Sequence, residues 1–282
     1  MEIILGGGCH CMDYYIDVLY HHGIEGQKWG IKHGPPYPID RTKSLTIKKG
    51  SKFGHVTNTK RMKLDSRGVY VFDPSDEHDA DVYKGAYAMG LKVKKLLAPV
   101  YEQRFENIED LKMPTHKEKV DAFVETISDE TSKKLQNGQT MEKYLDNYVS
   151  TLQNNIMWSQ TNNPEYYDSH KDLFTSMLND GKKWIEKRDK ESGYKLFMGN
   201  FAIKDDMKGV SDSFINKLIQ KGYNAMIDDL DSGRYNDAHL PIYVFNGKKT
   251  LRKERTKEMK LGEIVESVNR LRNRLGKEPD YT

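Results

Sequence analysis

Tyr223–Asp228 (YNAMID) and Pro241–Asn246 (PIYVFN) are two short apolar runs near the end of the chain, and they decide the predicted fold. The polar, turn-rich residues 231–238 separate them, which is typical of two strands joined by a loop. An amphipathic helix, Ser211–Lys221, is expected just before them, and Gly222 is a natural residue at which it would end. The chain is therefore predicted to close with a helix followed by a pair of strands.

Strand signals also occur early in the chain, where short apolar runs are bounded by glycine, proline or polar turn residues. A helix is expected to begin near Asp76, with Asp79 three positions later, between the strands predicted at Gly68–Asp73 and Val100–Phe105. Strands from both ends of the chain are therefore expected to pair with one another. The early strands are predicted at Ser44–Lys48, Lys52–Thr57, Gly68–Asp73 and Val100–Phe105.

The middle of the chain carries helix signals instead. Thr115 and Glu118 form a capping box, Thr140 precedes a second amphipathic run, and Asn163 with Pro164 marks the start of a third. Each run repeats its apolar residues at helical spacing. The sequence therefore predicts a helical insertion at about residues 107–200.

Trp158 and Trp184 are expected to fill the core of this helical layer. The whole chain is predicted to be α+β, with a leader at residues 1–40 and one α+β domain at residues 41–256 that contains the insertion. A basic C-terminal helix is expected at residues 257–282.

Composition limits the setting of the protein. The 282 residues carry 45 basic and 42 acidic side chains, so the formal net charge is only +3. This near balance argues against nucleic-acid binding by the surface as a whole. No apolar run approaches the roughly 18 residues of a membrane helix, and Met1–Leu5 lacks the basic flank of a secretory signal. We expect no membrane contact and a location in the cell or inside a particle.

Basic residues nevertheless gather within Lys248–Lys277. One interpretation is a solvated surface whose cations pair with nearby glutamates. The other is an electrostatic contact with nucleic acid or with an acidic protein surface.

The only two cysteines, Cys9 and Cys11, lie too close together for an unstrained disulfide. Together with His21 and His22 they have the donor types of a zinc site, although one intervening residue is shorter than most zinc spacings. Free thiols are the alternative, and we expect no metal.

His21–Pro38 is rich in glycine, proline and aromatic residues, so we expect a shaped, extended segment that a partner grips. The stretch HHGIEGQKWG within it resembles a segment of minor head proteins from phages and prophages of Gram-positive bacteria. This resemblance implies a phage virion or a bacterial host cytoplasm as the location. It also implies a capsid, portal or host protein as the partner of His21–Pro38.

A second resemblance concerns the strands. The order of the strand segments resembles the order of motifs in ADP-ribosyltransferase-like domains. The segments are Gly54–Thr57, Gly68–Phe72 and the closing unit Lys221–Asp229 with Leu240–Asn246. The fold implied is a split β-sheet with a helical insertion, and the substrate implied is NAD. The resemblance implies two sets of site residues. The catalytic set is His55, Tyr70, Asp228 and Asp229, and the NAD-binding set is His55, Thr57, Tyr70 and Tyr83.

The chain departs from that family at one position. The family places a glutamate just ahead of the last strand, but this sequence has no glutamate between Glu191 and Glu254. Either Asp228, Asp229 or Asp237 takes its place, or the domain is inert. The plainer interpretation is a core histidine at 55, an outward tyrosine at 70 and turn-forming aspartates at 228 and 229.

Three functions stay open on the sequence alone. The first is an ADP-ribosyltransferase-like enzyme that modifies a host macromolecule. The second is an inert component of a phage particle, and the third is a host-defence antagonist that acts by binding.

Overall fold

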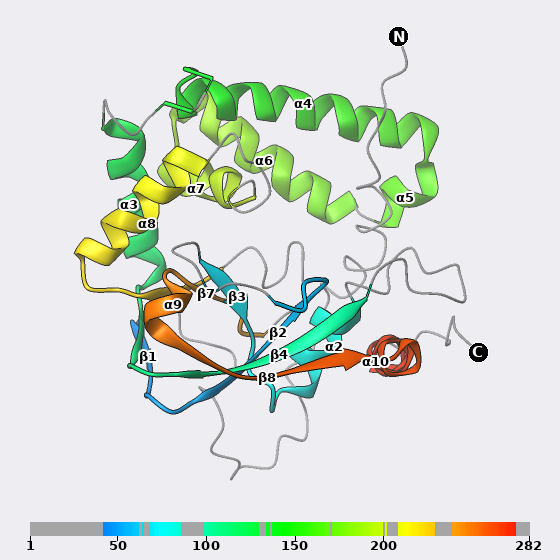
Figure 1. Ribbon diagram of the computed structural model, residues 1–282. Coiled ribbons are helices and arrows are strands. Elements are labelled where there is room, and N and C mark those ends of the chain that lie inside the picture. The colour runs from blue at the N-terminus through cyan, green and yellow to red at the C-terminus, as the bar shows by residue number, and fades with distance from the viewer. Residues whose placement is uncertain are drawn as a thin grey trace. The chain divides into compact units, whose positions relative to one another are not determined.

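The computed structural model describes residues 42–61, 64, 68–85, 99–129, 134–135, 137–169, 171–199, 201, 208–228 and 239–274. The chain divides into two compact units (Figure 1). The sheet unit combines Leu45–Met113 with Asn224–Thr282, and the helical unit contains Pro114–Tyr223. The predicted leader, residues 1–40, lies outside the described residues, as do Asp229 and Asp237.

The sheet unit contains small antiparallel sheets, which confirms the predicted α+β class. One has the strand order β2-β4-β8, a second has the order β3-β7-β6, and β1 pairs with β5. Strands from both ends of the chain pair as expected, because β8 lies beside β4 and β7 lies beside β3 (Figure 1). The strands are β1 (Leu45–Ile47), β2 (Lys52–Thr57), β3 (Val69–Val71), β4 (Val100–Asn107), β5 (Leu111–Met113), β6 (Ala225–Ile227), β7 (Ile242–Val244) and β8 (Leu251–Met259).

A pair of backbone hydrogen bonds joins the two three-stranded sheets. The Gly54 amide donates to the Phe72 carbonyl over 2.8 Å, and the Phe72 amide donates to the Gly54 carbonyl over 3.0 Å. A Cβ atom on Gly54 would lie 2.5 Å from the Phe72 ring, so only glycine allows this approach. The bridge brings the middle of β2 beside the end of β3.

Two apolar cores stabilise the sheet unit. The larger one contains Phe53, Val71 and Ile242, and the smaller one contains Val56, Phe72 and residues of α10. Helices α2 (Glu77–Gly85) and α10 (Leu261–Arg274) pack together, with α9 (Gly247–Thr250) preceding β8.

Several helices of the helical unit begin or end at the predicted signals. The Thr115 hydroxyl accepts from the Glu118 amide and the Glu118 carboxylate accepts from the Thr115 amide, which confirms the capping box. Thr140 caps the next helix, and Gly222 has a φ of 91° after the last one. The helices are α3 (His116–Ser128), α4 (Met141–Asn162), α5 (Pro164–Ser169), α6 (Lys171–Lys187), α7 (Lys190–Met198) and α8 (Lys208–Gln220).

The two tryptophans have different environments. Trp184 is 1% exposed, as expected, but Trp158 is 53% exposed, so the prediction that it fills the core is wrong. The reason is helical phase. The buried positions of α4 include Leu152, Ile156 and Ser159, and residue 158 lies off that stripe.

Element boundaries also differ from the prediction. The helical unit runs from Pro114 to Tyr223, so it extends beyond the predicted insertion at about residues 107–200. It includes α8 because α8 packs against α3. Lys257–Met259 complete β8 instead of opening the last helix, since they continue the pairing with β4. None of the described helices is long and apolar enough to cross a membrane.

Candidate functional site

His55 in β2 lies beside β3. Its Nδ1 is 2.8 Å from the Tyr70 carbonyl oxygen, and because a carbonyl only accepts, Nδ1 carries the proton and donates. Burial lowers the pKa of His55; the hydrogen bond to Tyr70 partly offsets this, and the nearby Lys253 ammonium lowers the pKa further. The ring is therefore neutral at pH 7, with Nε2 as a hydrogen-bond acceptor.

Tyr70 links β3 to the end of β6. Its hydroxyl donates to Oδ2 of Asp228 over 2.6 Å. The centroids of the Tyr70 and Tyr243 rings lie 4.8 Å apart. Asp228 is only 4% exposed, and its amide donates to the Pro241 carbonyl over 2.9 Å. Positions 55, 70 and 228 thus form one hydrogen-bonded series, although 158 residues separate Tyr70 from Asp228.

The other two residues expected to bind NAD lie in different places. Thr57 is half-buried at the end of β2, where alternation places it on the same face as His55. Tyr83 stacks on Phe72 with ring centroids 4.9 Å apart, in the core that contains Val56. Because neighbouring residues of a strand point to opposite faces, Tyr83 packs on the face of β2 opposite His55. The expectation that Tyr83 joins His55 at one site is therefore corrected.

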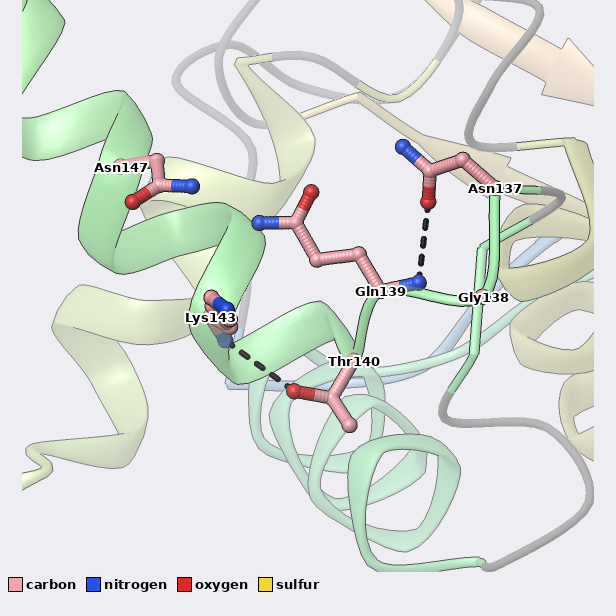
Figure 2. A pocket seen from close by; sticks show the side chains of 6 residues that line it. All are labelled: Asn137, Gly138, Gln139, Thr140, Lys143 and Asn147. Carbon is pink, nitrogen blue, oxygen red and sulfur yellow. Dashed lines mark hydrogen bonds between the residues drawn. The ribbon is translucent and has the colours of Figure 1, made fainter.

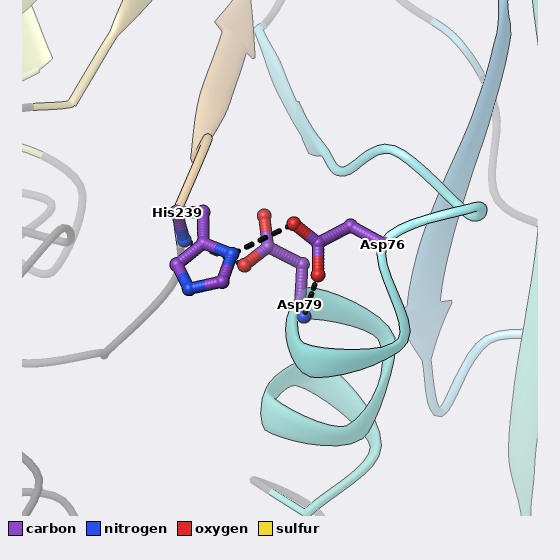
Figure 3. A group of neighbouring side chains, drawn as sticks. All are labelled: Asp76, Asp79 and His239. Atoms are coloured by element: carbon purple, nitrogen blue, oxygen red, sulfur yellow. Dashed lines mark hydrogen bonds and ion pairs between the residues drawn. The ribbon is translucent and has the colours of Figure 1, made fainter. Parts of the chain in front are cut away.

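A second polar cluster lies at the beginning of α2, and the sequence prediction missed it (Figure 3). Asp76 caps the helix by accepting from the amides of His78 and Asp79, over 2.9 and 3.1 Å. Nδ1 of His239 lies 2.7 Å from Oδ2 of Asp76. Asp79 in turn accepts from the amides of His239 and Leu240, over 2.6 and 3.0 Å. The cluster fastens the chain entering β7 to α2.

The two carboxylates of this cluster have opposite pKa shifts. Burial and the charge of Asp76 raise the pKa of Asp79 to about 6. Burial is the largest single influence on Asp76 and raises its pKa, but the hydrogen bond and charge of His239, the hydrogen bond from the Asp79 amide and the charge of His78 together bring the net pKa below its ordinary value. The surroundings therefore favour the charged form of Asp76 and disfavour the charged form of Asp79.

Asp76, Asp79 and His239 also have the donor types of a metal site, since one ligand atom from each lies within 4.8 Å of the others. Every carboxylate oxygen of the two aspartates already accepts a hydrogen bond from an N–H group. An ion could bind only if some of these hydrogen bonds, which hold the chain before β7 against α2, were broken. The cluster fits a structural clamp better than a metal centre.

A shallow pocket of about 560 Å³ lies in the helical unit, at the start of α4 (Figure 2). Its polar groups are used locally: the Asn137 side chain accepts from the Gln139 amide over 3.0 Å, and Thr140 caps α4. We assign it no chemistry.

Several cations among the described residues of the basic region Lys248–Lys277 pair with acidic side chains. Arg252 pairs with Glu106, and Lys257 pairs with Glu263. Arg270 and Arg274 both pair with the buried Asp81 of α2. These ion pairs favour the interpretation of a solvated surface over that of a nucleic-acid contact.

A scan of family models matched nothing, and searches of curated proteins and of solved structures gave no match either. The function is therefore argued from the geometry of the described residues.

Proposed function

We propose that the sheet unit is an ADP-ribosyltransferase-like domain that binds NAD at His55, Tyr70 and Asp228 and transfers ADP-ribose to a host macromolecule. The observation that carries the proposal is the hydrogen-bonded series from His55 to Tyr70 to Asp228. These are the positions at which the sequence resembles that family. The two small sheets joined at Gly54 and Phe72 are compatible with a split β-sheet.

Each residue would have a separate role. The neutral His55 would accept a hydrogen bond from a ribose hydroxyl through Nε2, because Nδ1 is held by the Tyr70 carbonyl. The Tyr70 ring offers an aromatic face to the nicotinamide ring. Its orientation is fixed because its hydroxyl is bonded to Asp228.

The reaction breaks the bond between the ribose C1′ and the nicotinamide nitrogen, and the electron pair leaves with neutral nicotinamide. Positive charge develops on the sugar, and the carboxylate of Asp228 would stabilise it. A nucleophile of the acceptor then bonds to C1′ and gives up its proton to water. Asp228 would thus serve in place of the glutamate that the family has, although its shorter side chain is largely buried.

The direct test is incubation of the full chain with labelled NAD and a bacterial lysate. We expect label on a lysate component, and we expect His55→Ala to abolish it. His116→Ala is the matched control, because His116 lies in the helical unit and bonds to Glu191 instead. Equal labelling by the wild type and His55→Ala would overturn the proposal.

A second candidate is an inert particle component that docks through His21–Pro38, in a phage virion or in the host cytoplasm. The glycine and proline pattern of that segment favours it, since a peptide with fixed turns loses little entropy on docking. Deletion of residues 1–40 should then abolish incorporation into particles while the sheet unit stays folded. Normal incorporation of the deleted protein would contradict this function.

A further inference from the structure

Gln103 of β4 has a buried side chain that is only half satisfied. Its exposed fraction is 0%, and its Nε2 donates to the Thr59 carbonyl over 2.9 Å. This bond fixes which end of the amide is oxygen, because only nitrogen donates. The oxygen, Oε1, is buried and has no hydrogen-bond partner among the residues that the structure describes. A buried acceptor without a partner is costly and calls for an explanation.

The position of Gln103 suggests what that acceptor is for. Gln103 is the register partner of His55 in the antiparallel pair of β2 and β4. Register partners lie on the same face with Cβ atoms about 5 Å apart. The two register partners therefore each carry a hydrogen-bond acceptor on the same face, Nε2 of His55 and Oε1 of Gln103.

A cation lies beside these two acceptors. Lys253 of β8 is close enough for its charge to lower the pKa of His55, and its ammonium is 3.5 Å from the Lys60 carbonyl. An amine ligand would satisfy the acceptors but would be repelled by Lys253. A simple anion would suit Lys253 but would offer no donor to His55 and Gln103. A ligand with hydroxyl donors next to an anionic group suits all three.

We infer that Gln103 is a further ligand-binding residue, which accepts from the 2-hydroxyl of a ribose vicinal diol while His55 accepts from the 3-hydroxyl. Lys253 faces the phosphate carried by the same sugar. The inference rests on the proposed function, because NAD supplies such a ribose phosphate. It adds a residue of β4 that no sequence motif indicated.

The experiment titrates the full chain with ribose 5-phosphate and with 2-deoxyribose 5-phosphate by calorimetry. The second probe lacks the vicinal diol but keeps the phosphate. We expect wild type to bind the ribose form about tenfold more tightly, the value of one hydrogen bond at the upper end of its range. Gln103→Met should remove this preference and leave binding of the deoxy form nearly unchanged.

Two controls separate binding from folding. Gln153→Met makes the same chemical change on an exposed position of α4 and should leave the preference intact. Lys253→Met should weaken both probes equally, because both carry the phosphate. A purely structural Gln103 would lower the melting temperature of Gln103→Met without changing the ratio of the two affinities. If that variant does not fold, equal binding of both probes by the wild type would itself overturn the inference.

NAD as a third ligand distinguishes the two proposals. If the wild type prefers the ribose probe but neither binds nor turns over NAD, the role of Gln103 stands and the transferase proposal fails. If Gln103→Met uses NAD with an unchanged KM, the transferase proposal stands and the role of Gln103 is overturned. If neither sugar phosphate nor NAD binds, both are overturned.

Discussion

The helix caps of the helical unit and the buried polar contacts of the sheet unit differ in range, although the helical unit also has distant pairs such as Tyr223 with Glu118. In the helical unit the caps join near neighbours, such as Thr115 with Glu118. In the sheet unit the polar contacts cross the chain: 158 residues separate Tyr70 from Asp228, and 160 separate Asp79 from His239. Long-range closure is costly in chain entropy, so these buried groups are held only because the surrounding sheets are formed. The residues proposed to bind NAD therefore depend on long-range pairing of the strands, whereas the helix caps depend on near neighbours.

The largest expected effect lies in the helical core. Trp184→Ala should lower the free energy of unfolding by about 3–5 kcal/mol, because the side chain is fully buried. Trp158→Ala should change it by less than about 0.5 kcal/mol, since that side chain is exposed. Urea unfolding of the two variants measures both values. Similar losses would show that α4 has a different helical phase from the one described.

The next effect is a pH dependence in the sheet unit. The folded pKa of Asp79, about 6, lies above the ordinary value of 3.8, so the folded state binds more protons between these values. Its contribution to stability is therefore complete below about pH 4 and is lost as the pH rises through 6, by up to about 3 kcal/mol. Asp79→Asn should remove this loss.

The comparison of the wild type with Asp79→Asn at each pH isolates Asp79. The lowered pKa of His55 has the opposite sign, since it stabilises the fold as the pH rises towards 6.5, but it is common to both proteins. Parallel stability curves for the two proteins between pH 4 and 7 would contradict the buried position of Asp79.

A smaller loss is expected where the two sheets join. Gly54→Ala places a methyl group 2.5 Å from the buried Phe72 ring and should cost about 2 kcal/mol. Gly209→Ala in α8 is the matched control, because nothing lies within 4 Å of its added Cβ. That change should be neutral or stabilising. Thermal unfolding compares the two, and equal melting temperatures would refute the close approach of the sheets.

The smallest effect tests the local contacts of the helical unit. Thr115→Ala removes the cap of α3 and should cost about 1 kcal/mol. Thr115→Ser keeps the hydroxyl and should restore most of that loss. Denaturant midpoints measure the difference, and an equal loss in both variants would show that packing of the Thr115 methyl, not the cap, matters.

The same difference in range explains what the sequence could predict. The caps at Thr115 and Thr140 and the glycine at 222 depend on residues within a few positions, so their signals are visible in the sequence. Trp158 is exposed because its position on α4 lies off the buried stripe of Leu152, Ile156 and Ser159, although a tryptophan is a typical core residue. The strands were found from short apolar runs because each run is bounded by turn residues.

The candidate site was only partly visible. His55, Tyr70 and Asp228 were chosen through a resemblance, and the structure brings them together. The sequence does not predict the cluster of Asp76, Asp79 and His239, although the spacing of the two aspartates predicts the start of a helix. No local signal joins position 239 to position 76, so only the folded sheets reveal that contact.

The central claim is that Tyr70 and Asp228 act together in binding NAD. A double-mutant cycle with Tyr70→Phe and Asp228→Asn, followed by the rise in melting temperature that NAD causes, tests it directly. The account predicts that NAD raises the melting temperature of the wild type and that each single variant shows a smaller rise. The rise in the double variant should be no smaller than the rise in the more impaired single variant. The absence of any NAD-dependent rise in the wild type, or losses that simply add, would contradict it.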